Sequence, residues 1–186
     1  LLLHLVSQQL PYYSLLNRFI YDSIYKVFMA YSGRYRVKNP KKYKGDHTNV
    51  IYRSLWEKYA FKWCDDNNNV KTWSSEETII PYLYEVDKRW HRYFVDLKIT
   101  MRDGKTFLIE IKPHKETQKP KGQRRTKKYI SEAMTYVKNM NKWEYASDYA
   151  KDQGYQFVIW TEKNEPLKSL IPKSTKPLKP FKKPYK

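Results

Sequence analysis

The chain has 186 residues, of which 40% are apolar and 17% aromatic, a composition typical of a single globular domain with a modest core. Lys and Arg outnumber Asp and Glu by 37 to 19, which gives a formal net charge of +18 and favours a polyanionic partner, nucleic acid before a membrane surface. A single cysteine, Cys64, excludes an intrachain disulfide framework and a cysteine-based zinc site, and fits a cytosolic protein. No apolar run approaches the ~20 residues of a membrane span.

The first 28 residues are apolar and aromatic, and they contain no methionine. Leu16, Ile20, Ile24 and Val27 recur at helical spacing and predict an amphipathic helix. The segment lacks the basic start and the small-residue cleavage site of a secretory signal. Because the composition changes at Met29, we expect the functional protein to begin there and residues 1–28 to be a separable extension. The alternative is an ordinary packing helix.

The first half of the remaining chain predicts a basic arm, a helix and a strand region. Residues 29–48 are rich in Lys, Arg and Tyr with Gly and Pro breaks, which indicates a basic arm or loop. Residues 49–64 have helical periodicity, with Thr48 or Asn49 as the N-cap. The run DDNNN ends that helix, and residues 70–85 are typical of strands.

The second half of the chain alternates strands and helices. It predicts, in order, a hairpin over 90–112, a basic loop over 113–128, helices over 127–141 and 143–153, and a strand over 155–161. The first of these helices carries Ile130, Met134, Val137 and Met140 or Asn141 along one face. Residues 166–186 hold five Pro and seven Lys and no acidic residue, so we expect an extended, mobile tail. This order predicts an α/β fold, a mixed central sheet flanked by helices.

The predicted hairpin has one favourable register. A two-residue loop at Asp103-Gly104 would place Asp96 opposite Ile111 and mix charged with apolar side chains on both faces. A three-residue loop that begins at Arg102 gives Gly104 the left-handed position that glycine tolerates. In that register Val95, Leu97 and Ile99 pair with Ile111, Ile109 and Phe107 on one apolar face. We therefore expect that face to join the core.

The other face of the same hairpin collects charge. Asp96 lies opposite Glu110, and Lys112 follows two residues later. Two carboxylates about 5 Å apart repel each other unless a divalent cation lies between them, and their hard oxygens select Mg²⁺ or Mn²⁺. A nearby amine can position a water or stabilise a developing phosphate charge, as metal-assisted phosphodiester hydrolysis requires. The alternative is a solvated strand face with an ordinary Glu–Lys surface pair.

The spacing of Asp96, thirteen intervening residues and then Glu110-Ile111-Lys112 resembles the signature of the PD-(D/E)xK nuclease superfamily. Val95 stands where that signature has proline, which is not a metal ligand. The run RSLWE in the predicted first helix is also similar, as is the wider region from Met29 to about residue 165. Within the superfamily, the chain resembles nucleases that cut transposon ends and the head completion nucleases of T4-type tailed phages. The resemblance implies one restriction-endonuclease-like domain over 49–165, with an αβββαβ core.

The resemblance also implies roles for individual residues. The implied metal ligands are Glu57, Asp96, Glu110 and the backbone carbonyl of Ile111, and the implied catalytic residues are Glu57, Asp96, Glu110 and Lys112, with Mg²⁺ or Mn²⁺ as cofactor. Lys112 would orient or activate the attacking water. The bland alternative for Glu57 is a surface helix residue beside Lys58. Glu76 and Glu77 either point into the site or occupy exposed strand positions.

Basic residues on both sides of this site would hold the DNA backbone. The candidate DNA-binding residues are Arg34, Arg36, Lys41 and Lys42 before the site, and Lys121, Arg124, Arg125, Lys127 and Lys128 after it. Nothing in the sequence resembles a base-reading helix, so we expect double-stranded DNA to be bound with little sequence specificity. We expect no membrane partner and no small-molecule substrate.

The resemblance implies a Mg²⁺-dependent DNA nuclease that processes packaged DNA so that phage heads can join tails. It would act in the cytoplasm of the infected bacterium, in association with the head or virion, and meet head or neck proteins. One alternative is a non-catalytic DNA-binding head or neck component with an inert site. Another is an RNA-binding module that stacks bases on Tyr31, Tyr35 and Tyr43.

Overall fold

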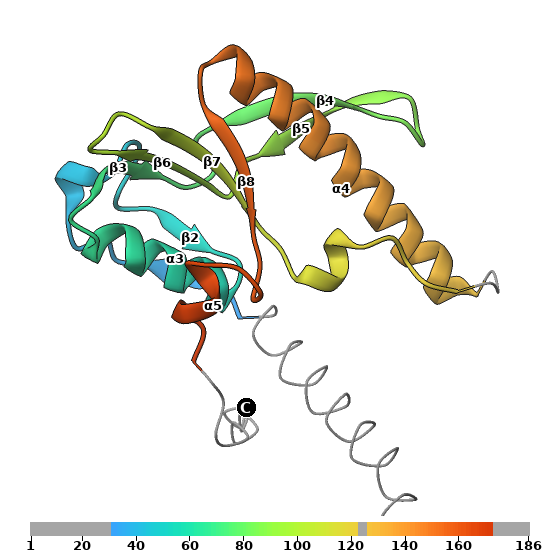
Figure 1. Cartoon of the computed structure of the whole chain (residues 1–186), viewed down its shortest axis with the longest axis horizontal. Helices are drawn as coiled ribbons and strands as arrows, with labels where there is room; N and C mark the ends of the chain where they lie inside the picture. The colour runs from blue at the N-terminus through green and yellow to red at the C-terminus, as the bar shows by residue number, and fades with distance from the viewer. Residues whose placement is uncertain (1–30, 123–125, 173–186) are drawn as a thin grey trace, which may run out of the picture.

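A four-stranded mixed sheet forms the centre of the computed structural model, which describes residues 31–122 and 126–172 (Figure 1). Its strand order is β3-β6-β7-β8, formed by β3 (Val70–Ser74), β6 (Leu97–Met101), β7 (Thr106–Ile111) and β8 (Gln156–Trp160). β7 and β8 are parallel, and the other pairs are antiparallel. The mixed sheet with flanking helices confirms the predicted α/β class, because α3, β3, β6, β7, α4 and β8 follow the αβββαβ order.

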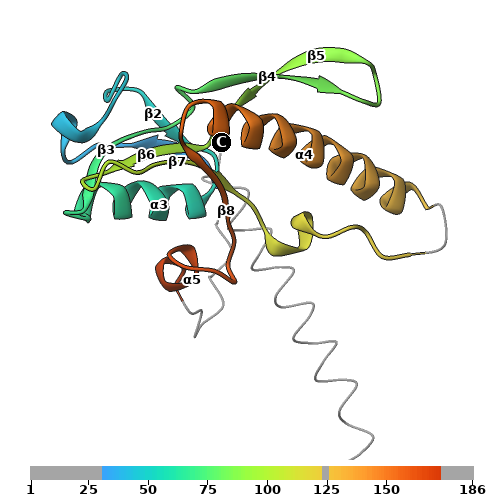
Figure 2. The same ribbon diagram turned by 45° about the horizontal axis from the view of Figure 1, so that its top comes forward.

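Two helices cover opposite faces of this sheet (Figure 2). α3 (Leu55–Asp66) packs on the side of Leu97, Ile99 and Ile109, which are almost completely buried. On the other side, Leu108 packs in a second apolar cluster with alanines of α4 (Lys127–Asp152). The alternation of side chains along β7 therefore sends odd-numbered residues toward α3 and even-numbered residues toward α4.

The β6–β7 hairpin has the predicted register. Leu97 pairs with Ile109, and Ile99 pairs with Phe107. The amide of Met101 donates to the carbonyl of Lys105 at 2.8 Å, which closes a three-residue loop, and Gly104 has φ 89°. Glycine is needed there because a side chain disfavours that conformation. The expectation that Val95 shares the apolar face of Ile111 is wrong, because Val95 packs with Leu108 in the second cluster.

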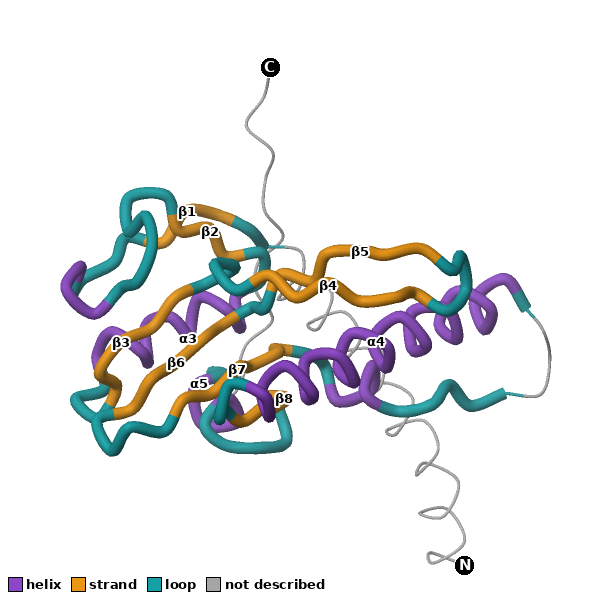
Figure 3. Tube along the Cα trace, turned by 90° about the horizontal axis from the view of Figure 1, so that it is seen from above, coloured by secondary structure: helices purple, strands orange, loops and turns teal. Residues whose placement is uncertain are grey.

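A separate hairpin is inserted between β3 and β6. Residues 70–85 form two strands, β3 and β4 (Ile79–Tyr84), and β4 pairs antiparallel with β5 (Arg89–Phe94). Figure 3 shows this hairpin running beside α4, beyond the four-stranded sheet. Between β3 and β4 the chain turns at Glu76, which has φ 57°, and this turn ends one strand and starts the next.

The segment expected to be a basic arm is folded. It contains β1 (Gly33–Tyr35) and the short 3-10 helix η1 (Pro40–Lys42), and β1 pairs with β2 (Val50–Tyr52), which follows the segment. The predicted helix start at residue 49 is also wrong, because the β-favouring run Val-Ile-Tyr forms β2. Ser54 is the N-cap of α3, and its hydroxyl accepts a hydrogen bond from the amide of Glu57.

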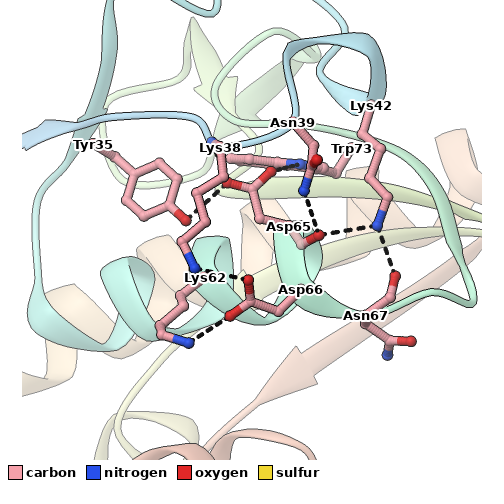
Figure 4. Close-up of polar contacts among 9 residues, drawn as sticks. All are labelled: Tyr35, Lys38, Asn39, Lys42, Lys62, Asp65, Asp66, Asn67 and Trp73. Atoms are coloured by element: carbon pink, nitrogen blue, oxygen red, sulfur yellow. Dashed lines mark hydrogen bonds and ion pairs between the residues drawn. The ribbon is translucent and has the colours of Figure 1, made fainter.

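Asp65 joins this segment to α3 (Figure 4). Its carboxylate, in a side chain only 1% exposed, accepts hydrogen bonds from the hydroxyl of Tyr35 and the amide of Lys38, both at 2.9 Å. The indole of Trp73 donates to the other oxygen at 3.3 Å. The ammonium of Lys42 donates to the backbone carbonyl of Asp65, at the C-terminus of the helix. A buried carboxylate with this many donors fixes where the segment lies.

α4 is one helix rather than the two that the sequence predicts. Residues 127–152 contain no Gly or Pro, so nothing breaks the helix where the apolar stripe changes face. The stripe predicted for its first half is largely not core, because Ile130 and Met134 are 46% and 47% exposed. The C-terminal half is held instead through Ala146 and Ala150. The preceding loop contains the 3-10 helix η2 (His114–Thr117).

After β8 the short helix α5 (Leu167–Leu170) packs on α3. Leu167 is fully buried in the first cluster, so the expectation of an extended tail is wrong for these four residues. The rest of the predicted tail from residue 173, and the predicted extension over residues 1–28, lie outside the described residues. Within the part of the chain that is described, no helix has the length and apolarity needed to cross a bilayer.

Candidate active site

Asp96 lies at the corner where the chain passes from one hairpin to the other. The amide of Val95 still bonds to the carbonyl of Thr78 at 2.9 Å, beside β4, whereas Leu97 already pairs in β6. One carboxylate oxygen of Asp96 accepts the amide hydrogen of Ile111 at 2.7 Å. This bond holds the Asp96 side chain beside the end of β7 and leaves its second oxygen for a ligand.

Glu110 is the most buried of the predicted site residues, with 1% of its surface exposed. It lies on β7 on the side that faces α4. Its Oε2 accepts a hydrogen bond from the Tyr93 hydroxyl at 2.6 Å, and its Oε1 lies 3.4 Å from the Lys112 ammonium. The short hydrogen bond from Tyr93 fixes the orientation of the Glu110 carboxylate. The hairpin therefore brings Asp96, Glu110 and Lys112 together, as the register predicts.

Glu57 reaches the site from the N-terminus of α3. Ser54 and Glu57 form a variant of the capping box, in which the Ser54 hydroxyl accepts from the Glu57 amide at 3.2 Å. One carboxylate oxygen of Glu57 accepts from the Ser54 hydroxyl at 2.9 Å, and the other accepts from the amide of Arg53, the residue before the N-cap, at 2.7 Å. Burial raises the pKa of Glu57 although these hydrogen bonds oppose the rise. Glu57 also interacts electrostatically with Asp96. It is neither a solvated surface residue nor in direct contact with Glu110 or Lys112 through a hydrogen bond.

The electrostatics of the site show three converging acids. Burial raises the pKa of Asp96 well above its ordinary value, and the charges of Glu110 and Glu57 raise it further, although Lys112 opposes this. Burial works against the charge of Lys112, but the carboxylates of Glu110 and Asp96 prevail and raise its pKa. Lys112 is therefore a charged ammonium at neutral pH, whereas Asp96 and Glu57 give up their protons less readily than ordinary carboxyl groups.

These donors suit a small, hard divalent cation. Mg²⁺ commonly keeps several waters and binds one or two carboxylates. The second oxygen of Asp96 and the Oε1 of Glu110, which lies 3.4 Å from the Lys112 ammonium, can supply those. A cation between them would relieve the repulsion that raises the Asp96 pKa. In the regions that the structure describes, no group of three or more His, Cys, Asp or Glu side chains forms a ready-made metal cage. The site thus fits a partly hydrated ion rather than a fully enclosed one.

Arg53 and Glu76 form the adjacent rim, which the sequence only partly indicated. The Arg53 guanidinium makes two bonds to the Glu76 carboxylate, at 2.7 and 2.9 Å. Glu76 is therefore turned toward Arg53 and interacts electrostatically with Glu57, whereas Glu77 is exposed. The positive φ of Glu76 directs it there, and no sequence pattern signals such a conformation for a glutamate.

Two further residues at the site were not predicted. Tyr93 on β5 bonds to Glu110, and Lys142 on α4 lies with its ammonium 5.0 Å from the centroid of the Tyr93 ring. Both come from elements that reach the site only through tertiary packing. Their sequence neighbourhoods show ordinary strand and helix patterns, so a single sequence offers no signal for either.

The predicted DNA-binding residues fall into separate places. Arg34 and Arg36 line a groove of about 970 Å³ together with Lys38 and His47. Lys42 is held at the end of α3 by the carbonyls of Asp65 and Asn67, at 3.0 and 2.9 Å. The remaining members are exposed or lie outside the described residues: Lys41 in η1, Lys121 in the loop, Lys127 and Lys128 at the start of α4, and the undescribed Arg124 and Arg125. None of them contacts Asp96 or Glu110 within the described chain.

Comparison with known proteins identifies similar sequences. The model of the TnsA-like endonuclease N-terminal family matches residues 67–162, which include β3 to β8 and therefore the site hairpin. A curated protein of Enterobacteria phage T4, the head completion nuclease, is 42% identical over 139 residues. That alignment covers 72% of this chain and 93% of the phage protein.

Proposed function

Since the chain belongs to the TnsA-like endonuclease family, we propose that it is a metal-dependent nuclease that hydrolyses phosphodiester bonds of DNA between Asp96, Glu110 and Lys112. The observation that carries this proposal is the convergence of two carboxylates and an amine on one hairpin face. Lys112 lies 3.4 Å from Glu110, and Asp96 is held by the amide of Ile111. An inert surface pair would not need a glutamate that is only 1% exposed.

Each residue has a defined part in the hydrolysis. Asp96 and Glu110, with Glu57 and the carbonyl of Ile111 nearby, would hold Mg²⁺ or Mn²⁺. When bound, the ion supplies a Lewis acid and lowers the pKa of water. Lys112 orients the attacking water and stabilises the charge that develops on the phosphate as the water oxygen bonds to phosphorus and the P–O bond to one sugar breaks. Tyr93 holds the Glu110 carboxylate in position.

The substrate that fits best is double-stranded DNA bound through its backbone, because the net charge of +18 favours phosphate contacts. The relative from phage T4 is named a head completion nuclease. We propose the same setting for this chain: it processes packaged DNA during phage head completion in the infected cell, next to head or neck proteins.

A plasmid-nicking assay tests the activity. The purified protein is incubated with supercoiled plasmid in Mg²⁺, Mn²⁺ or EDTA, beside Glu110→Gln and Lys112→Gln. We expect nicking only with metal, and a loss of about 10²–10⁴-fold in each variant. Lys105→Gln is the matched control, because Lys105 lies in the turn of the same hairpin and pairs only with Asp103 among the described residues.

The alternative, a non-catalytic DNA-binding component, predicts a different pattern. Such a protein would bind DNA equally well in EDTA and would tolerate both substitutions. Folded wild-type protein that binds DNA tightly but leaves the plasmid intact with either metal would therefore overturn the nuclease proposal.

A further inference from the structure

α4 brings a second lysine to the charged face of the β6–β7 hairpin. Ala146 of α4 packs in the second apolar cluster with Leu108 and Tyr93, which anchors the helix over this face. One turn earlier, the ammonium of Lys142 lies 5.0 Å from the centroid of the Tyr93 ring, and the hydroxyl of that ring bonds to Glu110. Lys142 therefore reaches the site from α4, whereas Lys112 reaches it from the position that follows β7.

The charge of Lys142 is not paired. Among the hydrogen bonds and ion pairs of the described residues, none involves its ammonium, which lies over the face of the Tyr93 ring. The carboxylates of Glu110 and Asp96 attract it from a distance, and Lys112 and Lys138 repel it. Burial lowers the pKa of Lys142. A half-buried cation without a partner is costly unless a ligand supplies the anion.

An anion that could supply this partner must also be compatible with the acids nearby. A phosphodiester would meet this condition when a divalent cation held by those acids offsets their charge, because its oxygens can accept hydrogen bonds from amines. Lys138 differs from Lys142 although it lies one turn away: its side chain is exposed and lies 5.9 Å from the Tyr84 ring. Of these two lysines, only Lys142 is partly buried.

We propose that Lys142 binds the phosphate group at which DNA is cut, so that this phosphate lies between the amines of Lys142 and Lys112. The inference rests on the proposed nuclease function and adds a residue from α4 to its site. It makes the helix part of the active site and not merely a support for the sheet. The competing explanation is that Lys142 only covers the Tyr93 ring with its aliphatic stem.

The substitutions Lys142→Met and Lys142→Arg separate the two explanations. Methionine keeps an unbranched apolar stem of similar length, whereas arginine keeps the charge. The matched control is Lys151→Met, at an exposed lysine near the C-terminus of the same helix. For each variant, affinity for a short DNA duplex is measured over a series of salt concentrations with Ca²⁺, a hard cation that takes oxygen ligands, in place of Mg²⁺. The melting temperature and the single-turnover cleavage rate with Mg²⁺ are measured beside it.

If the proposal is right, Lys142→Met lowers the slope of log affinity against log salt by about 0.9, the loss of one phosphate contact. Its melting temperature stays the same or rises, and single-turnover cleavage falls by about 10²-fold or more at saturating DNA. Lys142→Arg retains the wild-type slope and most of the cleavage rate. Lys151→Met matches the wild type in all three measurements.

Two results would overturn the proposal. One is a Lys142→Met protein with the wild-type salt slope and cleavage rate. The other is a lower melting temperature in both Lys142 variants with no rescue by arginine, which would indicate a packing role. If the wild type fails to cleave and Glu110→Gln binds DNA as the wild type does, the nuclease proposal fails. The salt slope measured with Ca²⁺ still decides whether Lys142 contacts a phosphate.

Discussion

The two hairpins of this molecule differ in how their faces are covered. β6–β7 lies in the middle of the sheet, with α3 on one face and α4 on the other, so both sets of side chains are enclosed. β4–β5 packs one face on α4, and its other face leaves Ile79 and Phe94 exposed by 44% and 39%. Both hairpins are antiparallel and rich in apolar residues. The two hairpins therefore differ in whether helices cover both of their faces, and not in their content of apolar residues.

This difference in packing explains why a charged residue on β6–β7 indicates a functional site. A charged residue on the open face of β4–β5, such as Arg92, is solvated and needs no partner beyond the Phe94 ring 5.4 Å away. Glu110 on the enclosed hairpin would be costly unless it had partners and a function. The same residue type therefore indicates a surface in one hairpin and a site in the other.

The largest effect expected from this comparison concerns matched leucines. Leu97→Ala removes a fully buried side chain of β6 and should lower the free energy of unfolding by about 2–5 kcal/mol. Leu83→Ala, on the open face of β4, should lower it by less than about 1 kcal/mol. Urea denaturation of both variants measures the difference. Equal losses would show that the open face of β4–β5 is covered in solution.

The second effect concerns metal and pH at matched aspartates. The raised pKa of Asp96 means that the metal-free native state keeps a proton that the unfolded chain loses near its ordinary value of about 3.9. Stability should therefore fall as pH rises from about 4 through the native pKa of Asp96. Mg²⁺ at 100 times its dissociation constant should restore about 2.7 kcal/mol at neutral pH. Asp96→Asn should abolish the Mg²⁺ response and weaken the pH dependence, of which Glu57, with its own raised pKa, keeps a part.

Asp87, in the turn of β4–β5, has a pKa that is shifted in the opposite direction from that of Asp96. Slight burial pushes its pKa upward, but the ring of His91 and the amide of Arg89 outweigh this and hold it below the ordinary value. Asp87→Asn should leave the Mg²⁺ response intact. Thermal melts at several pH values, with and without Mg²⁺, compare the two. A metal response that persists in Asp96→Asn would remove Asp96 from the set of ligands.

The smallest effect concerns the two turns. Gly104 has φ 89°, and a Cβ added there would meet no atom within 4 Å, so Gly104→Ala tests backbone conformation alone and should destabilise by about 1–2 kcal/mol. Lys88, with φ 56°, occupies a left-handed position without glycine, so Lys88→Gly should stabilise by less than about 1 kcal/mol. Melting temperatures of both variants measure this. Destabilisation by Lys88→Gly would mean that the lysine side chain holds the turn.

Local patterns in the sequence predict the enclosed hairpin well. Alternating apolar residues and a glycine at the loop are sufficient to set the β6–β7 register, and the register alone brings Asp96 beside Glu110. The α/β class follows from the order of the elements. The capping box of Ser54 and Glu57 is also a local pattern, although the helix begins six residues later than its periodicity indicated.

The remaining features depend on contacts between distant segments. The β4–β5 insertion was missed because residues 75–78 contain no Gly or Pro to mark the break between β3 and β4. The sequence predicts two helices in place of the continuous α4, because the apolar stripe changes to another face of the helix where α4 begins to pack on the sheet. Tyr93 reaches Glu110 from β5, and Lys142 reaches the Tyr93 ring only when α4 packs on the sheet, so no spacing rule along the chain places them at the site.

The buried carboxylate of Asp65 has a consequence for how the protein folds. Its donors, Tyr35, Lys38 and Trp73, come from the N-terminal segment and from β3, so none can leave without stranding a charge away from water. The segment that carries Tyr35 and Lys38 is therefore not an appendage that can be trimmed while the nuclease core persists. It melts together with α3 as one cooperative unit, and the protein is expected to resist proteolysis between them until it unfolds as a whole.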